Sequence, residues 1–119
     1  PYWDGSARGA IVGLSLDHEP KHLFRAVLEG IALEQAIATE AMEEQTGKAD
    51  AMIAAGGGTN CALLMEIMAS VLERPLFVWP ARQVDPVEAL VPTYRARKEV
   101  YRDLYHATRD IHTRLGAIT

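Results

Sequence analysis

The chain has 119 residues, of which 49% are hydrophobic and 24% are charged, enough to build the core of one small domain. Its 12 basic and 16 acidic residues give a formal net charge of −4 without any block of Lys and Arg, which argues against nucleic acid as a partner. The single cysteine, Cys61, is typical of a reducing compartment, and no apolar run approaches the roughly 20 residues of a membrane helix, so we expect a cytoplasmic protein.

The N-terminal region is predicted to be a loop. Proline and glycine among polar residues indicate a loop over residues 1–9, and the short apolar run at residues 10–14 indicates an edge strand or a turn. The sequence opens inside this loop without an initiator Met, so we expect a piece of a longer polypeptide. Trp3, like Trp79 further on, is expected to pack in the core or against a loop.

A long helix is predicted next. Asp17 would supply an acidic cap, Pro20 suits the first turn, and Gly47 is a natural stop. Gly30 lies inside this helix, where glycine is unfavourable, and therefore predicts the close approach of another element. The predicted buried stripe comprises Leu23, Val27, Ile31, Leu33, Ile37 and Ala41. The acidic side chains expected on a solvated face are Asp17, Glu40, Glu43 and Glu44.

A strand, a helix and a second strand follow. Residues 51–55 form an apolar run typical of a strand covered on both faces, residues 61–73 carry a helical apolar pattern that stops at Arg74-Pro75, and residues 76–79 form the next strand. This order predicts a βαβ unit with parallel strands and a right-handed crossover.

The C-terminal part is predicted to be a loop followed by a helix. Three prolines and no clear period indicate a loop over residues 80–92, and residues 93–115 form a helix. Its expected apolar stripe comprises Tyr94, Tyr101, Leu104, Tyr105, Ala107, Ile111 and Leu115. The fold class expected from these elements is α/β, a βαβ unit with long packing helices.

Three consecutive glycines, Gly56, Gly57 and Gly58, join the first strand of this unit to its helix. Without Cβ atoms the backbone can approach a ligand closely, and the free N–H groups of the following helix favour an anion. Glycine also ends elements and makes room for packing, so a nucleotide role and a purely structural role both remain open. Thr59 follows in place of the Walker lysine, which excludes a P-loop.

No other motif carries chemistry. Cys61 begins a helix without a basic neighbour in sequence, so it is expected to pack or to line a ligand. The four histidines lack a metal-binding spacing, and no Ser/His/Asp or Cys/His set occurs, so we predict neither a metal site nor catalytic residues.

Several of these segments together resemble the FGGY carbohydrate kinases, the sugar and polyol kinases that include glycerol kinase and xylulokinase. The second family signature is matched by Gly9, Ile11, Gly13 and Leu14, then His22-Leu23, and then residues 26–29. The run AAGGGTNCALLMEIMASVLERPL resembles the nucleotide-binding turn and helix of the family, and YRARKEVYRDLYHATRDI resembles its C-terminal helix. The resemblance covers nearly the whole chain.

The resemblance implies part of an actin-like, ribonuclease-H-like ATPase domain, with residues 1–119 as a single partial domain, the C-terminal half of the FGGY C-terminal domain. It implies a kinase that transfers a phosphoryl group from ATP, with Mg²⁺, to the hydroxyl of a ketose such as xylulose, or otherwise of glycerol. Gly56, Gly57, Gly58 and Cys61 would contact the nucleotide, with Gly57 beside its phosphates or ribose. Cys61 falls where relatives often carry Asn or Ser, which form better hydrogen bonds than a thiol.

The chain also departs from the family. In FGGY kinases the catalytic aspartate, the first phosphate loops and the sugar-binding residues lie upstream of the position of Pro1, so this chain is expected to be inactive alone. The family also carries a helix with an acidic start and the sequence Ala-Leu-Gly-Ala-Ala after the strand at residues 76–79, which residues 80–86 lack. The alternative hypothesis is a non-catalytic interaction or dimerisation module, which would form a homodimer.

Overall fold

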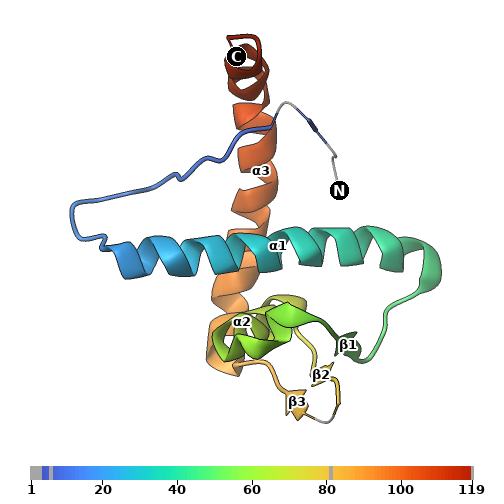
Figure 1. The fold of residues 1–119 in the computed structure, drawn as a ribbon. Helices are drawn as coiled ribbons and strands as arrows, with labels where there is room; N and C mark the ends of the chain where they lie inside the picture. The colour runs from blue at the N-terminus through green and yellow to red at the C-terminus, as the bar shows by residue number, and fades with distance from the viewer. Residues whose placement is uncertain (1–3, 6, 81, 119) are drawn as a thin grey trace.

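The computed structural model describes residues 4–5, 7–80 and 82–118, and its long helices α1 and α3 cross each other (Figure 1). The helix α2 and a small sheet lie on the other side of α1 from most of α3 (Figure 1). The elements in chain order are α1 (Pro20–Thr46), β1 (Met52–Ala54), the 3-10 helix η1 (Gly57–Asn60), α2 (Ala62–Leu72), β2 (Leu76–Val78), β3 (Arg82–Val84), the 3-10 helix η2 (Glu88–Leu90) and α3 (Val91–Gly116).

The limits predicted for α1 are confirmed, but its cap is a different acidic residue. The N-cap is Glu19 rather than Asp17, and the Glu19 backbone N–H donates to Nδ1 of His22 at 2.9 Å. Pro20 is the first helical residue, and Gly47 ends the helix with φ +85°. The prediction of Asp17 as the cap was wrong. The imidazole of His22, one turn into the helix, accepts the Glu19 N–H and so makes Glu19 the N-cap residue.

The apolar run at residues 10–14 is neither a strand nor a turn, contrary to the prediction. It has no regular secondary structure and is exposed, because no strand among the described residues lies beside it to pair with it. Two imidazole contacts flank the segment, and the one to His112 ties it to α3. Ser15 N–H donates to His18 Nδ1 at 2.9 Å, and Arg8 N–H donates to His112 Nδ1 at 2.7 Å. The prediction for Trp3 lies outside the described residues.

The predicted parallel strand pair is confirmed. β1 pairs with β2 in parallel, with Met52 opposite Leu76 and Ile53 opposite Phe77. The loop predicted for residues 80–92 is partly wrong, because β3 pairs antiparallel with β2 and η2 precedes α3. β3 is three residues long and mostly polar, so it carries no hydrophobic period that a sequence could reveal.

The core lies between α1, α2 and the sheet. Its buried members are Leu28, Ala32, Leu33 and Ala36 of α1, Met65, Ile67, Ala69, Val71 and Leu72 of α2, Leu76 and Val78 of β2, and Tyr94 of α3. The stripe predicted for α1 was correct at Leu33 and Ile37. It was wrong at Val27 and Ile31, which are 55% and 50% exposed, and at Ala41, which is also exposed. The buried face instead begins at Leu28 and includes Ala32 and Ala36. The hydrophobic pattern missed these alanines because alanine is only weakly hydrophobic.

Gly30 does not mark a close helix crossing among the described residues. A Cβ placed on Gly30 would meet nothing within 4 Å, so the packing role predicted for it is wrong here. The apolar stripe of α3 is buried at Tyr94 and half-buried at Tyr101 and Tyr105. Beyond these residues α3 extends away from the core (Figure 1), and Ile111 is 54% exposed.

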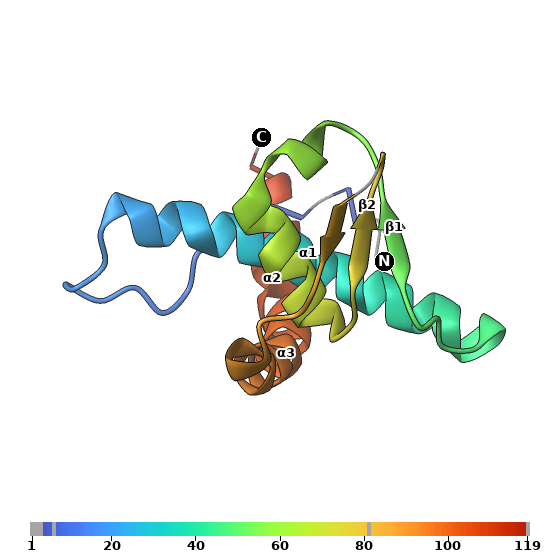
Figure 2. The ribbon, with the colours of Figure 1, turned by 90° about the horizontal axis from the view of Figure 1, so that it is seen from below.

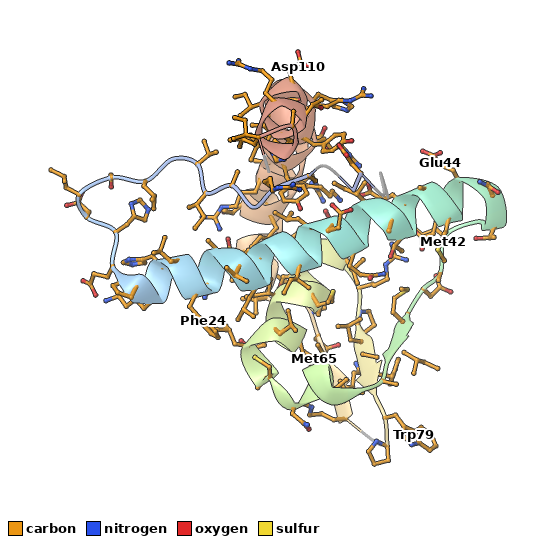
Figure 3. All side chains as sticks on the ribbon, turned by 45° about the horizontal axis from the view of Figure 1, so that its top comes forward. Phe24, Met42, Glu44, Met65, Trp79 and Asp110 are labelled. Carbon is orange, nitrogen blue, oxygen red and sulfur yellow. The ribbon has the colours of Figure 1, made fainter. Side chains whose placement is uncertain are left out.

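The sheet is covered on one face by α2 (Figure 2). Leu76 and Val78 are buried on that face, and Met52 and Ala54 are half-buried. On the other face Ile53 is 79% exposed, so the expectation of a strand covered on both faces is wrong for the described chain. Trp79 is 75% exposed and points away from the molecule (Figure 3), contrary to its predicted packing role.

Candidate functional site

The glycine turn lies where β1 ends and leads through η1 into α2. β1 and β2 are parallel, so their carboxyl ends meet at one edge of the sheet, and the Trp79 N–H donates to the Ala54 carbonyl there at 3.1 Å. In open α/β sheets this edge is where ligands bind. The topology therefore places Gly56, Gly57 and Gly58 at a position suited to binding.

The turn is held in shape by its own backbone. Gly56 has φ +100°, a conformation that side chains other than hydrogen rarely allow. Its carbonyl accepts hydrogen bonds from the Thr59 N–H at 3.1 Å and the Thr59 hydroxyl at 2.7 Å. The Cys61 N–H donates to the Gly58 carbonyl at 3.1 Å and closes the turn before α2.

The space beside the turn is open. A Cβ built on Gly56 or Gly57 would meet nothing within 4 Å, and one on Gly58 would meet only Leu64 Cδ2, at 3.8 Å. Within the part of the chain that the structure describes, no hydrogen bond uses the N–H groups of these three glycines. Unused N–H groups in front of a helix N-terminus form a surface that favours an anion.

Arg82 adds a positive charge to the turn, and sequence reasoning missed it. One of its guanidinium NH2 groups donates to the Thr59 carbonyl at 3.1 Å. Arg82 reaches the turn because β3 folds back along β2, with Arg82 opposite Val78. The sequence gives no sign of this proximity, since Arg82 lies 23 residues from Thr59 in a stretch without a clear period.

Cys61 is the N-cap of α2 and is half-buried. Its thiol makes no capping hydrogen bond, and its side chain packs against the core cluster. Cys61 therefore has the packing role predicted for it, whereas its contact with a ligand stays a prediction.

A buried carboxylate, Glu29, joins α1 to α3 away from the turn. Its side chain accepts hydrogen bonds from Arg25 at 2.8 Å and Tyr94 at 3.2 Å, and it forms an ion pair with Arg97. Burial raises the pKa of Tyr94, and the hydrogen bond from Arg25 opposes that shift. The described partners of Glu29 come from both α1 and α3, so this cluster joins the two helices.

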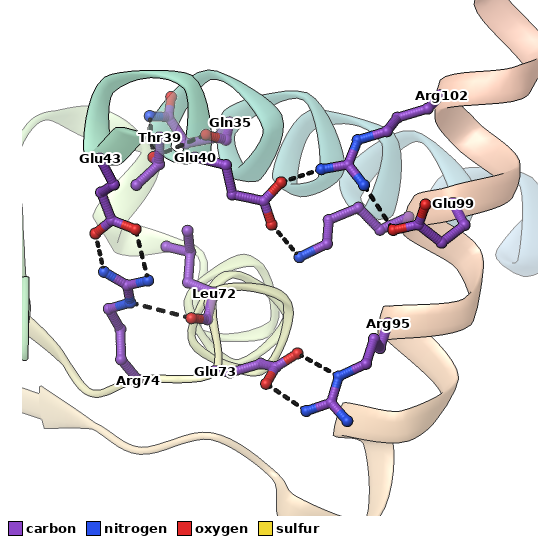
Figure 4. A network of polar contacts seen from close by, with 11 residues as sticks. Gln35, Thr39, Glu40, Glu43, Leu72, Glu73, Arg74, Arg95, Glu99 and Arg102 are labelled. Atoms are coloured by element: carbon purple, nitrogen blue, oxygen red, sulfur yellow. Dashed lines mark hydrogen bonds and ion pairs between the residues drawn. The ribbon is translucent and has the colours of Figure 1, made fainter. Parts of the chain in front are cut away.

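Two glutamates predicted on a solvated face make ion pairs between elements, which corrects that prediction (Figure 4). Glu40 bridges Lys98 and Arg102 of α3, and Glu43 accepts two hydrogen bonds from the buried Arg74. Arg74, together with the N–H of Ala49, lowers the pKa of Glu43 from 4.5 to about 2. Asp17 and Glu44 are exposed, as predicted.

Two further features of the described residues concern metal ions and membranes. No group of three or more His, Cys, Asp or Glu side chains there is placed to hold a metal ion. None of the helices described has both the length and the apolar character needed to cross a bilayer.

The sequence matches a family model described as the FGGY family of carbohydrate kinases, C-terminal domain, over residues 1–85. A glycerol kinase from Haloarcula marismortui is 36% identical over 116 residues, which cover 92% of this chain and 21% of the relative. A glycerol kinase from Leptospira biflexa serovar Patoc is 45% identical over 73 residues, which cover 60% of this chain and 15% of the relative. The chain thus spans about a fifth or less of these relatives.

Two solved structures share the fold. A xylulose kinase from Rhodospirillum rubrum superposes with a TM-score of 0.82 at 24% identity, covering 90% of this chain and 28% of that one. A xyloylose kinase from Brucella ovis superposes with a TM-score of 0.88 at 22% identity, covering 93% of this chain and 30% of that one. The expected fold class, an α/β part of an actin-like ATPase domain, is confirmed.

Proposed function

The chain belongs to the FGGY family of carbohydrate kinases, and from this premise we propose that it supplies part of the nucleotide pocket of an ATP-dependent sugar or polyol kinase. Since the chain spans less than a third of the solved kinases it matches, the activity proposed is that of a larger protein. We propose that residues 1–119 are one partial domain of it, inactive alone, and that the kinase works in the cytoplasm, where ATP is abundant.

The single observation that carries this proposal is the open glycine turn at the carboxyl end of β1. Gly56, Gly57 and Gly58 leave their N–H groups beside free space, in front of α2. Gly57 would lie against the phosphates or ribose, and Cys61 would face the adenine side. Arg82, which contacts Thr59, would add positive charge beside the phosphates.

In phosphoryl transfer the donor and acceptor must be held in line while negative charge on the phosphates is neutralised. The backbone N–H groups of the turn fit a phosphate or ribose oxygen, and their fixed geometry would orient the nucleotide without reorganisation. Mg²⁺ bound with ATP would supply positive charge that offsets the charge of the phosphates. The described residues offer no cluster that fits the metal, so its ligands and the base for the attacking hydroxyl are proposed to lie in the rest of the kinase.

The acceptor is proposed to be a polyol or a ketose. The resemblance points first to a ketose such as xylulose, whereas the relatives at 36% and 45% identity are named glycerol kinases, which supports glycerol. Assaying a full-length polypeptide that contains this segment, with MgATP and either glycerol or xylulose, would separate the two.

The alternative, a non-catalytic interaction module, is supported by one feature. Between β2 and α3 the described chain has only β3 and η2, where the family resemblance leads us to expect a further helix beside the nucleotide. The module and the kinase part differ in whether the glycine turn binds a nucleotide.

The test is a titration of the isotope-labelled chain with MgADP, followed by the amide signals of residues 56–61. We expect these signals to shift in the parent chain and to stay unchanged in Gly57→Val, because the new side chain fills the space beside the turn. Gly9→Val is the matched control, since a Cβ on Gly9 also meets nothing within 4 Å but lies far from the turn in sequence. Absence of shifts in the parent chain at millimolar MgADP would favour the module.

A further inference from the structure

A strap of chain, residues 7–18, runs from α3 to the start of α1 (Figure 1). None of these residues belongs to a helix or a strand. The strap buries little apolar area, since Ile11, Val12 and Leu14 are 54%, 64% and 56% exposed. Because apolar burial contributes so little, polar contacts at its two ends decide where the strap lies.

The first end of the strap is tied to α3 by a neutral imidazole. The Arg8 N–H donates to His112 Nδ1 at 2.7 Å, across 104 residues of sequence. Beside this bond the Tyr105 hydroxyl donates to the Asp4 carboxylate at the longer distance of 3.4 Å. A ring nitrogen accepts a hydrogen bond only while it carries no proton, so the Arg8 contact requires His112 to be unprotonated at Nδ1.

The second end of the strap depends on two more imidazoles. The Ser15 N–H donates to His18 Nδ1 at 2.9 Å, and the Ser15 hydroxyl lies 2.9 Å from the same nitrogen. The Glu19 N–H donates to His22 Nδ1 at 2.9 Å. The rings of His18 and His22 are in edge contact, with their centroids 5.6 Å apart. Both ends of the strap therefore use lone pairs that a proton would take.

We propose that the strap is pH-sensitive: it lies against α3 while His112, His18 and His22 are neutral, and it leaves α3 when acid protonates them. Histidine is the side chain whose charge ordinarily changes between about pH 5 and about pH 8. A proton on Nδ1 turns the acceptor into a donor that faces another donor, so the bond is lost. The open form then binds more protons than the closed form, and opening is favoured as the pH falls.

The charges around His112 nearly cancel, so the loss of its acceptor decides the outcome at the first end. His112 lies in a hollow of about 310 Å³ between the N-terminal segment, α1 and α3. Carboxylates would attract an imidazolium there, and guanidinium groups in equal number would repel it. The titratable and charged side chains near it are Asp4 and Arg8 before α1, Glu34 of α1, and Tyr101, Tyr105, His106 and Arg109 of α3.

The charges around His18 and His22 do not cancel, and they favour opening. A hollow of about 460 Å³ lies between the strap, α1 and α3. In it the guanidinium groups of Arg25 and Arg97 share the carboxylate of Glu29. Two imidazolium rings would add positive charge to a wall that is already positive, and the repulsion would push the strap away. The other titratable side chains near it are Tyr94 in the hollow and Asp17, Glu19 and Lys21 at the start of α1.

Opening would uncover the junction between α1 and α3. Residues 11–14 form one wall of the larger hollow, which Glu29 and Tyr94 also line. When the strap leaves, water reaches this junction, while the apolar core between α1 and α2 is untouched. The inference does not require that the glycine turn binds a nucleotide.

The test is a pH titration of the isotope-labelled chain by NMR, from about pH 8 to about pH 5.5. The coupling between the Arg8 amide nitrogen and His112 Nδ1 reports the bond, and the chemical shift of that Nδ1 reports its protonation. We expect the coupling to disappear along the same pH curve as the protonation. Backbone order parameters over residues 9–14 should fall below about 0.6, the range of flexible backbone, while those of Leu33 and Val71 in the core stay at about 0.85.

Two substitutions of His112 separate its protonation from the contact itself. His112→Gln offers an amide oxygen that accepts but does not titrate, so the first end should stay ordered in acid while the Ser15 N–H still loses its bond. His112→Ala removes the acceptor and should leave residues 7–14 flexible at every pH. Asp110→Asn is the matched control, because it removes a titratable charge from an exposed position of the same helix and should leave the transition unchanged.

Three results would overturn the proposal. The first is a strap that keeps the coupling and its order parameters down to about pH 5.5. The second is release that does not follow the protonation of His112 in the parent chain, or an equal loss of order on acidification in His112→Gln. The third is an ordered strap in His112→Ala at about pH 8, which would assign its position to other contacts. If His112→Gln is flexible at every pH, the two curves of the parent chain still decide.

Discussion

Helix α1 makes two junctions of opposite character with the other long elements. Against α2 it buries Leu28, Ala32, Leu33 and Ala36, a purely apolar seam. Toward α3 it presents carboxylates. Glu29 is joined to Arg97 and Tyr94, and Glu40 is joined to Lys98. Glu40 also pairs with Arg102 (Figure 4).

The two junctions stabilise the fold in different ways. Burying apolar area is favourable without any directional requirement, so the seam between α1 and α2 supplies most of the free energy. An ion pair gains little at the surface and must repay desolvation when it is buried, so the α1 and α3 junction mainly fixes the orientation of the helices. Substitutions in the two junctions should therefore differ in size.

The largest effect is expected in the apolar seam. Leu33→Ala removes a side chain that is 6% exposed and should lower the free energy of unfolding by about 2–5 kcal/mol, because it loses buried area and leaves a cavity. Ile31→Ala is the matched control at a 50% exposed position two residues away, and it should change stability by less than about 0.5 kcal/mol. Urea unfolding measures both, and equal effects would contradict the assignment of the buried face.

The same comparison explains how much of the fold could be predicted. The elements of the apolar seam were found from the sequence, since the periodicity of α1 and α2 and the stops at Gly47 and Pro75 are local signals. The phase of α1 was missed because Ala32 and Ala36 are weakly hydrophobic although both are fully buried. Small residues reveal their role only when the partner helix is in place.

The charged junction could not be predicted from the sequence. A glutamate on a helix is expected to face solvent unless the fold is known to bring a Lys or Arg from another element close to it. Glu40 meets Lys98 at a separation of 58 residues, and Glu43 meets Arg74 at 31. At the candidate site the glycine turn follows from local sequence, whereas Arg82 arrives through the β2 and β3 pairing. Binding by Gly56, Gly57, Gly58 and Cys61 stays a prediction.

A smaller loss is expected in the charged junction. Glu29→Gln keeps the shape of a side chain that is 8% exposed but removes its charge toward Arg25 and Arg97. We expect a loss of about 1–3 kcal/mol, since hydrogen bonds to charged groups are lost while both arginines can still turn toward water. Glu99→Gln, at a 65% exposed partner of Arg102, is the control and should cost less than about 0.5 kcal/mol. If both variants unfold alike in urea, Glu29 does not join the helices.

Acid should weaken the charged contacts before the apolar seam. The pKa of Glu43 is lowered from 4.5 to about 2 by hydrogen bonds from Arg74, so the folded chain holds this carboxylate ionised more strongly than the unfolded chain does. Its contribution is complete above about pH 5 and is lost as the pH falls toward 2. Glu43→Gln should flatten the fall of unfolding free energy over that interval, measured by urea melts at several pH values. Glu44→Gln, at an exposed neighbour, should leave the slope unchanged.

The smallest effect should come from stiffening α1 without touching either junction. A Cβ on Gly30 meets nothing within 4 Å, so Gly30→Ala adds no contact and should raise the free energy of unfolding by about 0.5–1 kcal/mol through helix propensity alone. Ala41→Gly at an exposed position of the same helix should lower it by a similar amount. A loss of stability in Gly30→Ala would mean that another element packs over Gly30 in solution, and α1 would then have a third junction. If the two variants instead change the free energy of unfolding by equal and opposite amounts, helix propensity alone accounts for both. The tertiary contacts of α1 then lie on its faces toward α2 and α3.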